Sequence, residues 1–383
     1  MVRILHTADL HLDTPFTGSG LGREKVLQRR NDMITVFRGI TDLARRREVD
    51  LLLIAGDLFE DEYVNQATVD RVFAAIAELS PLPALISPGN HDPFHPASPY
   101  ATEQLPSNLT VFRNDTVERI DFPQLDTSVH GLAFRAHHES RQLLKGLSLD
   151  AGPGINILLA HGGVFSGSPG HAEEYNPISR EDLVNCGADY CALGHYHRAD
   201  DVLSDKRGLR AAYPGSPEPL RYRHTGEHGV LLLEIEPDGG PISVERINTQ
   251  RRRYHSFEID LSDCADAAAV DARIGETIGG VSLDGDLVEL VLSGAVPPGV
   301  VLSPSDYQDI AARVFDFRFT DRTRPDYDVE TLATEPTARG AFCKEIMAEI
   351  ESAEDPERKE ILQRALWLGL AAFDGQRVEE LPL

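Results

Sequence analysis

Short apolar runs alternate with longer amphipathic stretches along the first part of the chain. Three runs are nearly continuous in aliphatic residues, as expected for buried strands, and they span residues 2–6, 50–55 and 83–86. Between them, apolar side chains recur at helical spacing over residues 23–47 and 66–79. The pattern predicts strand–loop–helix units of an open α/β sheet, in which ligands bind at the carboxyl ends of the strands.

The middle of the chain carries shorter apolar runs with little helix between them. Beyond residues 93–126, to which the pattern assigns no element, strands are expected at 129–133, 155–160, 190–193, 211–213, 230–235 and 243–247. Ser179 is a good N-cap for one short helix, predicted over 179–185. We therefore expect this half of the domain to be antiparallel and β-rich.

A basic triplet, Arg251 to Arg253, marks a predicted domain boundary. The first domain is assigned to residues 1–250, and a small α/β domain to 251–330, where predicted strands and helices alternate. Apolar residues every fourth position, with an Asp355-Pro356 helix start, predict a C-terminal helical segment over 331–383. The helical stripes are interpreted as a helix-hairpin core, with docking on a partner as the alternative.

Polar residues of one chemical kind follow each of the first three predicted strands. The first strand is followed by Asp9 and His11, the second by Asp57, and the third by the loop Pro88–Asp92 with Asn90 and His91. A carboxylate, an amide oxygen and an imidazole side by side suit a divalent metal and a charged substrate. A polar turn is the structural alternative for the loop taken alone.

Three histidines at later strand ends extend this set, namely His161, His195 and His197. Carboxylate, amide and imidazole ligands without a thiolate suit manganese, iron or zinc. Asp57 is the natural bridge, because one carboxylate between two cations offsets charge on both. Two metals about 3.5–4 Å apart can share a hydroxide for in-line attack on phosphorus. The residues therefore predict a dimetal site for phosphoester hydrolysis.

The composition restricts the class of protein and its expected compartment. The 383 residues carry a formal net charge of −25, which argues against a broadly basic nucleic-acid surface. Four cysteines lack paired spacing and are expected to be reduced and structural. No stretch approaches the ~18 apolar residues of a membrane helix, and the start of the chain is interpreted as a strand rather than a signal peptide. We expect a cytoplasmic protein without membrane contact.

The ordered motifs D-x-H, G-D, G-N-H-D, H-G-G and G-H-x-H, all within residues 9–197, resemble the calcineurin-like metallophosphoesterase superfamily. The resemblance implies a two-layered β-sandwich flanked by helices. It assigns one metal to Asp9, His11, Asp57 and His197, and the other to Asp57, Asn90, His161 and His195. His91 would face the scissile phosphate as the catalytic group, and Asp92 would orient His91.

Within that superfamily the chain is similar to the SbcD-like and YhaO-like branch, the nuclease subunits of double-strand-break repair complexes. The similarity is carried by residues 4–12, 55–59 and 213–216. It implies a DNA exonuclease or endonuclease that uses two divalent ions, Mn²⁺ first and Fe²⁺ or Zn²⁺ otherwise. It also implies a small capping domain over 251–330 and docking of residues 331–383 on an SbcC-like coiled-coil ATPase.

Other interpretations remain open. The same site could hydrolyse a small nucleotide or phosphodiester, which the acidic composition favours. The chain could be a DNA-end-binding subunit with weak catalysis, because Glu60 stands where the nuclease pattern often has histidine. The C-terminal segment could serve a homodimer.

Three groups outside the motifs have a functional and a structural interpretation. Arg221, Tyr222 and Arg223 are candidate nucleic-acid contacts or a solvated hairpin. Arg251 to Arg253 are interpreted as balancing acidic neighbours rather than binding phosphate. His137 and His138 are interpreted as surface loop residues rather than part of the substrate cleft.

Overall fold

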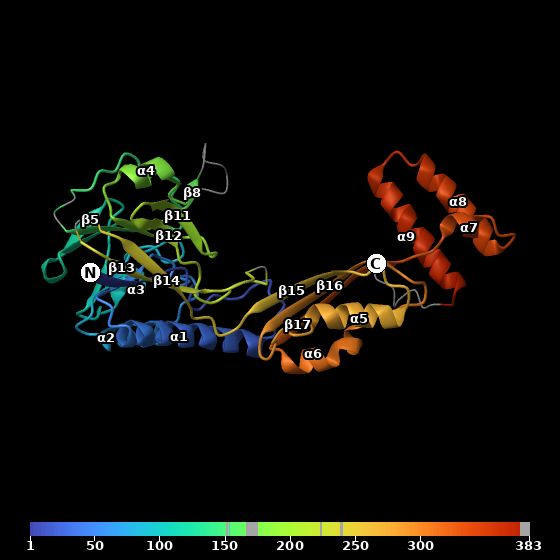
Figure 1. Ribbon diagram of the computed structural model, residues 1–383, viewed down its shortest axis with the longest axis horizontal. Helices are drawn as coiled ribbons and strands as arrows, with labels where there is room; N and C mark the ends of the chain where they lie inside the picture. Colours follow the sequence, from blue (N-terminus) through green and yellow to red (C-terminus); the bar gives the residue numbers. More distant parts are fainter. Residues whose placement is uncertain (151, 153, 166–174, 223, 238–239, 376–383) are drawn as a thin grey trace. The chain divides into compact units, whose positions relative to one another are not determined.

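The computed structural model describes residues 1–150, 152, 154–165, 175–222, 224–237 and 240–375 (Figure 1). The chain divides into two compact units, Met1–Arg253 and Tyr254–Leu383. Among the described residues, no helix is both long and apolar enough to cross a membrane.

In the first unit, the strands that were predicted from apolar runs all form within a few residues of their expected positions. They are β1 (Val2–Thr7), β2 (Leu51–Ile54), β3 (Ala84–Ile86), β6 (Thr127–Gly131), β7 (Ile155–His161), β10 (Tyr190–Gly194), β12 (Gly208–Tyr213), β13 (Gly229–Ile235) and β14 (Ile242–Asn248). The predicted helices are present as α1 (Arg23–Arg46), α2 (Gln66–Ala77) and α4 (Arg180–Asn185). Ser179 caps α4 by accepting a hydrogen bond from Asp182 N–H, as predicted.

The pattern missed several short elements. They are α3 (Pro99–Thr102), β4 (Leu109–Val111), β5 (Glu118–Phe122), a 3₁₀ turn (Pro123–Leu125), β8 (Val164–Phe165), β9 (Ile178–Ser179) and β11 (Asp200–Asp205). Most of these segments are only three to six residues long and β5 and β11 are largely polar, so they carry little periodic signal.

Among the described residues, twelve strands form one curled mixed sheet in the order β4-β3-β2-β1-β13-β14-β12-β10-β7-β6-β5, with β11 paired to β12. β1 to β4 run parallel, as the strand–helix alternation predicts. The expectation of an antiparallel second half was wrong in part. β6, β7, β10 and β12 also pair in parallel. Between β7 and β10 the chain passes through α4, which makes a short βαβ crossover.

The curled sheet has an apolar layer between its two halves and a helix-covered layer on each outer face (Figure 1). Side chains alternate between layers along each strand, as the two-residue period requires. On β2, Leu53 enters the inner layer and Leu52 packs with the outer layer beside α1 and α2. On β7, Ile157 is inner and Leu158 packs with α4. This is the sandwich flanked by helices that the resemblance implied.

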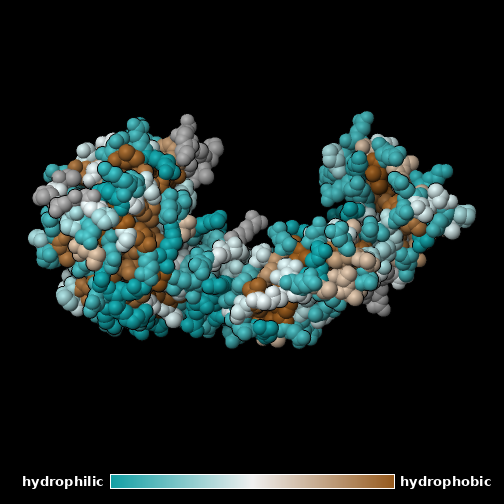
Figure 2. All heavy atoms as spheres, in the orientation of Figure 1, coloured by the Kyte–Doolittle hydropathy of each residue, from teal (hydrophilic) through white to brown (hydrophobic). Residues whose placement is uncertain are grey.

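The second unit begins with a three-stranded parallel sheet. Its elements are β15 (Tyr254–Asp260), α5 (Ala267–Ile278), β16 (Leu287–Val296), a 3₁₀ turn (Pro304–Tyr307), α6 (Gln308–Arg313) and β17 (Asp316–Pro325). Among the described residues, three further helices follow, α7 (Val329–Ala333), α8 (Ala338–Ser352) and α9 (Pro356–Phe373). Asp355 caps α9, in the position that the sequence predicted. Figure 2 shows apolar atoms along α9, where Ile361 and Phe373 are 60% and 49% exposed.

Candidate metal centre

The predicted ligands lie at the carboxyl ends of β1, β2, β3, β7 and β10, where the connecting loops meet. Asp9, His11 and Asp57 all have left-handed backbones, with φ of 53°, 48° and 51°. Such conformations cost non-glycine residues about 1–3 kcal/mol each and gather at functional sites. The strand-end loops therefore hold these side chains in fixed, strained positions.

Two glycines allow the loops to approach one another closely. Gly56 has φ of +84°, and a Cβ there would overlap the His161 ring. A Cβ on Gly89 would overlap the Asp57 carboxylate. The glycines in the G-D and G-N-H-D motifs thus create the space that the polar side chains occupy.

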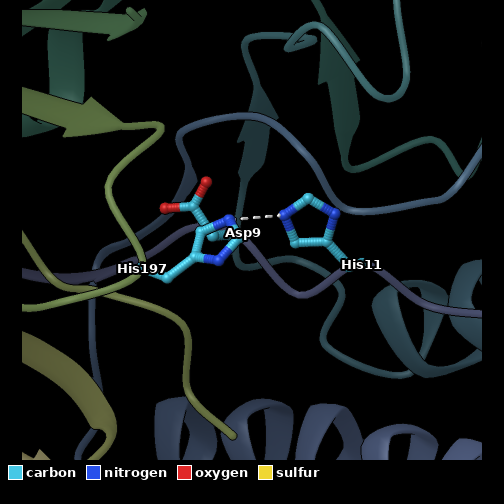
Figure 3. A group of neighbouring side chains, drawn as sticks. All are labelled: Asp9, His11 and His197. Atoms are coloured by element: carbon cyan, nitrogen blue, oxygen red, sulfur yellow. Dashed lines mark hydrogen bonds between the residues drawn. The ribbon is translucent and has the colours of Figure 1, made fainter. Parts of the chain in front are cut away.

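Asp9, His11 and His197 form the first group of candidate ligands (Figure 3). The Nε2 atoms of His11 and His197 lie 3.0 Å apart. His11 Nδ1 lies 2.7 Å from a Glu60 carboxylate oxygen, which can only accept, so Nδ1 carries the proton and Nε2 of a neutral ring carries a lone pair. This lone pair and the Asp9 carboxylate face the same space, and that space suits a cation.

Asp9, Asp57 and His161 form the second group. His161 Nδ1 is 2.8 Å from the Ala55 carbonyl, so it donates and leaves Nε2 with a lone pair when the ring is neutral. That Nε2 faces Asn90 Oδ1 at 3.0 Å and Asp57 Oδ2 at 3.4 Å. When the ring is neutral, these three atoms are all electron-rich, and the donor set fits a divalent ion that would take the place of a proton on Nε2.

His195 also lies at this site, where its backbone contacts Asp9. Its backbone N–H donates to the Asp9 carboxylate at 3.0 Å. Its ring contacts His161 with centroids 5.3 Å apart, and Tyr175 and Tyr196 lie against it at 5.5 and 5.3 Å. All predicted metal ligands are therefore gathered around Asp9 and Asp57, both of which are buried.

Burial and neighbouring charges shift the pKa values of the candidate ligands. Burial raises the pKa of Asp9 to about 6. Burial also acts to raise the pKa of Asp57, but the charge and hydrogen bond of His161 hold it well below its usual value. His161 in turn has its pKa raised to about 9, because Asp57 outweighs the opposing effect of burial. Burial lowers the pKa of His195 to about 4, which keeps that ring neutral as a ligand must be.

His91 is the most exposed of the candidate site residues that lie around Asp57, with 44% of its side chain accessible. Its backbone N–H donates to Asp57 Oδ1 (2.8 Å) and its Nδ1 donates to Glu60 Oε2 (2.9 Å). Burial lowers the pKa of His91, but the Glu60 hydrogen bond and the Asp57 charge outweigh it and raise the value to about 9. Its Nε2 is thereby left to meet a substrate.

Glu60 holds two imidazoles at once, His11 through Oε1 and His91 through Oε2. Its side chain is 14% exposed. Burial would raise its pKa, but the hydrogen bonds from His11 and His91 lower the value to about 2. The sequence marked Glu60 only as a departure from a pattern, and its contacts show that it orients a candidate ligand and the candidate catalytic histidine.

Replacing Glu60 with glutamine is expected to lower turnover by about 10–100-fold. The glutamine amide has one acceptor oxygen, so one imidazole loses its partner while the size of the side chain is kept. Steady-state kinetics together with metal content would measure the effect. Unchanged kinetics and unchanged metal affinity would contradict the orienting role.

The role predicted for Asp92 differs from what the structure shows. The Nδ1 atom of the His91 ring is hydrogen-bonded to Glu60 and not to the Asp92 carboxylate. Asp92 instead accepts hydrogen bonds from several buried donors: the N–H groups of Asp57 (3.0 Å), Leu58 (2.7 Å), Phe59 (3.3 Å) and Gly89 (2.8 Å), and the Tyr100 hydroxyl (2.5 Å). It therefore joins the loops after β2 and β3, and residue spacing alone could not reveal this.

Asp92→Asn is expected to destabilise the first unit by about 2 kcal/mol or more. The new amide NH₂ would face buried N–H donors in place of an accepting oxygen. Urea unfolding would measure the loss. Asp42→Asn is the matched control, because Asp42 lies exposed on α1 and its change should stay within about 0.5 kcal/mol. Equal stability of both variants would contradict the joining role.

The other predicted contacts lie as follows. Arg221 is exposed, Tyr222 is only 8% exposed, and Arg223 lies outside the described residues. Little of the Tyr222 ring is therefore available for stacking on a substrate. Arg251 and Arg252 pair with the buried Asp32 at 2.8 and 2.6 Å, as expected for a boundary that balances acidic neighbours.

Residues 2–199 match the family described as Calcineurin-like phosphoesterase. The chain is 28% identical over 316 residues, covering 80% of this chain and 75% of the relative, to the uncharacterized metallophosphoesterase YhaO of Bacillus subtilis. It is 24% identical to the DNA double-strand break repair protein Mre11 of Aeropyrum pernix (69% of this chain, 64% of the relative) and 28% identical to that of Saccharolobus solfataricus (62% and 61%). The match thus spans less than two thirds of either Mre11 protein.

Proposed function

Because the chain belongs to the calcineurin-like phosphoesterase family, we propose that it is a metal-dependent phosphodiesterase whose substrate is DNA. The family uses a divalent metal pair. The observation that carries the proposal is the meeting of electron-rich ligand atoms around Asp57, described above for His161 and Asn90. A divalent cation bound there would replace the proton that Asp57 otherwise stabilises on His161.

We assign one ion to Asp9, His11, Asp57 and His197, and the other to Asp57, Asn90, His161 and His195, with Mn²⁺ as the first choice. When bound, such a pair lowers the pKa of a shared water and offsets charge on the phosphate. The chain supplies the rest. Asp57 Oδ1 accepts a hydrogen bond from the His91 backbone N–H at 2.8 Å, which holds His91 beside the assigned metal pair. The buried ligands exclude bulk water from one side of the site.

His91 is assigned the catalytic role. Glu60 fixes the proton on His91 Nδ1, so the ring presents Nε2 towards solvent and substrate. A protonated His91 can donate a hydrogen bond to the phosphate or a proton to the leaving oxygen. The raised pKa, about 9, favours that protonated form at neutral pH.

DNA is proposed as the substrate on two grounds. Two of the relatives are named as DNA double-strand break repair proteins. The chain also carries a second unit, Tyr254–Leu383, which hydrolysis of a small molecule does not need. We propose that residues 251–330 are the small α/β domain of the capping type, and that α8 and α9, the latter with exposed Ile361 and Phe373, dock on a coiled-coil ATPase or on a second copy of the chain.

A small phosphodiester is the second candidate substrate. The net charge of −25 disfavours long-range attraction of a polyanion, and Tyr222 is buried rather than open for stacking. Both observations weaken the case for extended DNA contacts.

The deciding experiment compares linear duplex DNA, single-stranded DNA and bis(p-nitrophenyl) phosphate as substrates of the full chain in Mn²⁺. Degradation of DNA by the wild type, lost in His91→Ala, is the expected result. Cleavage of the small ester alone would leave the metal site in place and overturn the DNA assignment. Hydrolysis of the small ester thus distinguishes an error in the DNA assignment from an error in the metal-site assignment.

A further inference from the structure

A separate cluster of ligand-type side chains lies beside the loop that carries Asn90 and His91. Asp61, His95 and His137 come from the loops after β2, β3 and β6, and one ligand atom of each lies within 4.8 Å of the others. We propose that these three residues form a third divalent-cation site, distinct in its ligands from the pair around Asp57.

The distances suit one shared ion. Asp61 Oδ2 lies 2.7 Å from His95 Nε2 and 3.8 Å from His137 Nε2. The Asp61 side chain is 11% exposed, whereas His95 and His137 are 30% and 51% exposed. Two imidazoles and one carboxylate are a common ligand set for divalent first-row metals, and they leave open positions for water or an anionic oxygen.

His137 is oriented as a ligand would be. Its Nδ1 lies 2.9 Å from the Asn90 carbonyl oxygen, so Nδ1 carries the proton and donates. When the ring is neutral, Nε2 has a lone pair that faces the Asp61 carboxylate. Donation of the other ring N–H to a backbone carbonyl is the usual support of a metal-binding histidine.

His95 needs one proton to move. Its Nδ1 accepts a hydrogen bond from the Ala97 N–H at 3.2 Å, so Nε2 carries the proton that Asp61 accepts. A cation at Nε2 requires the proton on Nδ1 instead, and the Ala97 N–H then turns to water. Ala97 is exposed, so that exchange is possible, and it makes the third site weaker than the buried pair.

The site is tied to the catalytic loop by the backbone. The Asp61 N–H donates to the His91 carbonyl at 3.0 Å, and His137 binds the Asn90 carbonyl. An ion held by Asp61 and His137 would therefore fix two contacts of the Asn90–His91 segment from outside the metal pair.

The test is equilibrium dialysis of the full chain against Zn²⁺, followed by elemental analysis. The wild type should bind one zinc ion more than either His137→Ala or His95→Gln. His138→Ala is the matched control, because His138 is the exposed neighbour of His137 and its variant should bind as many ions as the wild type. Asp57→Asn should lose the pair and keep the third ion, so failure of the pair and failure of this site are distinguishable.

Zinc content equal to the wild type in both His137→Ala and His95→Gln would overturn the proposal. Loss of all zinc from both variants would overturn it as well, because the residues would then act only through the pair. Thermal unfolding of each variant confirms folding, and His95→Gln keeps the test valid if His137→Ala does not fold.

Discussion

Asp57→Asn is expected to lower phosphodiester hydrolysis by about three orders of magnitude or more, because both metal ions would lose a shared ligand. Asp57 is fully buried between the two ligand groups, with Oδ2 lying 3.6 Å from His11 Nε2 and 3.4 Å from His161 Nε2. Asparagine keeps the shape but removes the charge that two cations would share. Metal content and turnover, measured on the same preparation, should fall together.

The matched control is Asp42→Asn, an exposed carboxylate on α1, which should retain both metal and turnover. Far-ultraviolet circular dichroism of Asp57→Asn should match the wild type. A well-folded Asp57→Asn variant that keeps its metal and its activity would contradict the bridging role.

His91→Ala is expected to lower turnover by about 10²–10⁴-fold while the metal content stays at the wild-type value. The reason is geometric, because the His91 side chain is the exposed part of the constellation and the assigned ligands do not include it. The two measurements together separate a catalytic histidine from a ligand.

Loss of metal in His91→Ala would reassign the residue. One nitrogen of His91 does lie within 4.8 Å of ligand atoms of His11 and Asp57, so a ligand role is the specific alternative. In that case turnover and metal content would fall in parallel, as they are expected to do in Asp57→Asn.

The clustering of the candidate ligands could be predicted because each follows a strongly apolar strand. Asp9, Asp57 and His161 end or follow runs whose side chains are almost all buried, and parallel strands bring their carboxyl ends to one edge. Local signals of this kind can be recognised in the sequence without any knowledge of the tertiary structure.

The contacts among the loops could not be predicted in the same way. Glu60 and Asp92 act through groups that meet only when the loops after β2 and β3 fold together. The parallel pairing of β7 and β10 was missed because the helix that makes the crossover, α4, is very short. β11 was missed because, of its six residues, only Val202 is buried, so its sequence carries no apolar run.

The ligand assignment proposed above places the Asp57 carboxylate between two metal ions. Anomalous diffraction from crystals of the full chain grown with Mn²⁺ tests it directly. We predict two manganese peaks that both contact the Asp57 carboxylate, one beside His11 and His197 and the other beside Asn90 and His161. A single peak at Asp57, or manganese bound only elsewhere on the chain, would contradict the bridging role of Asp57.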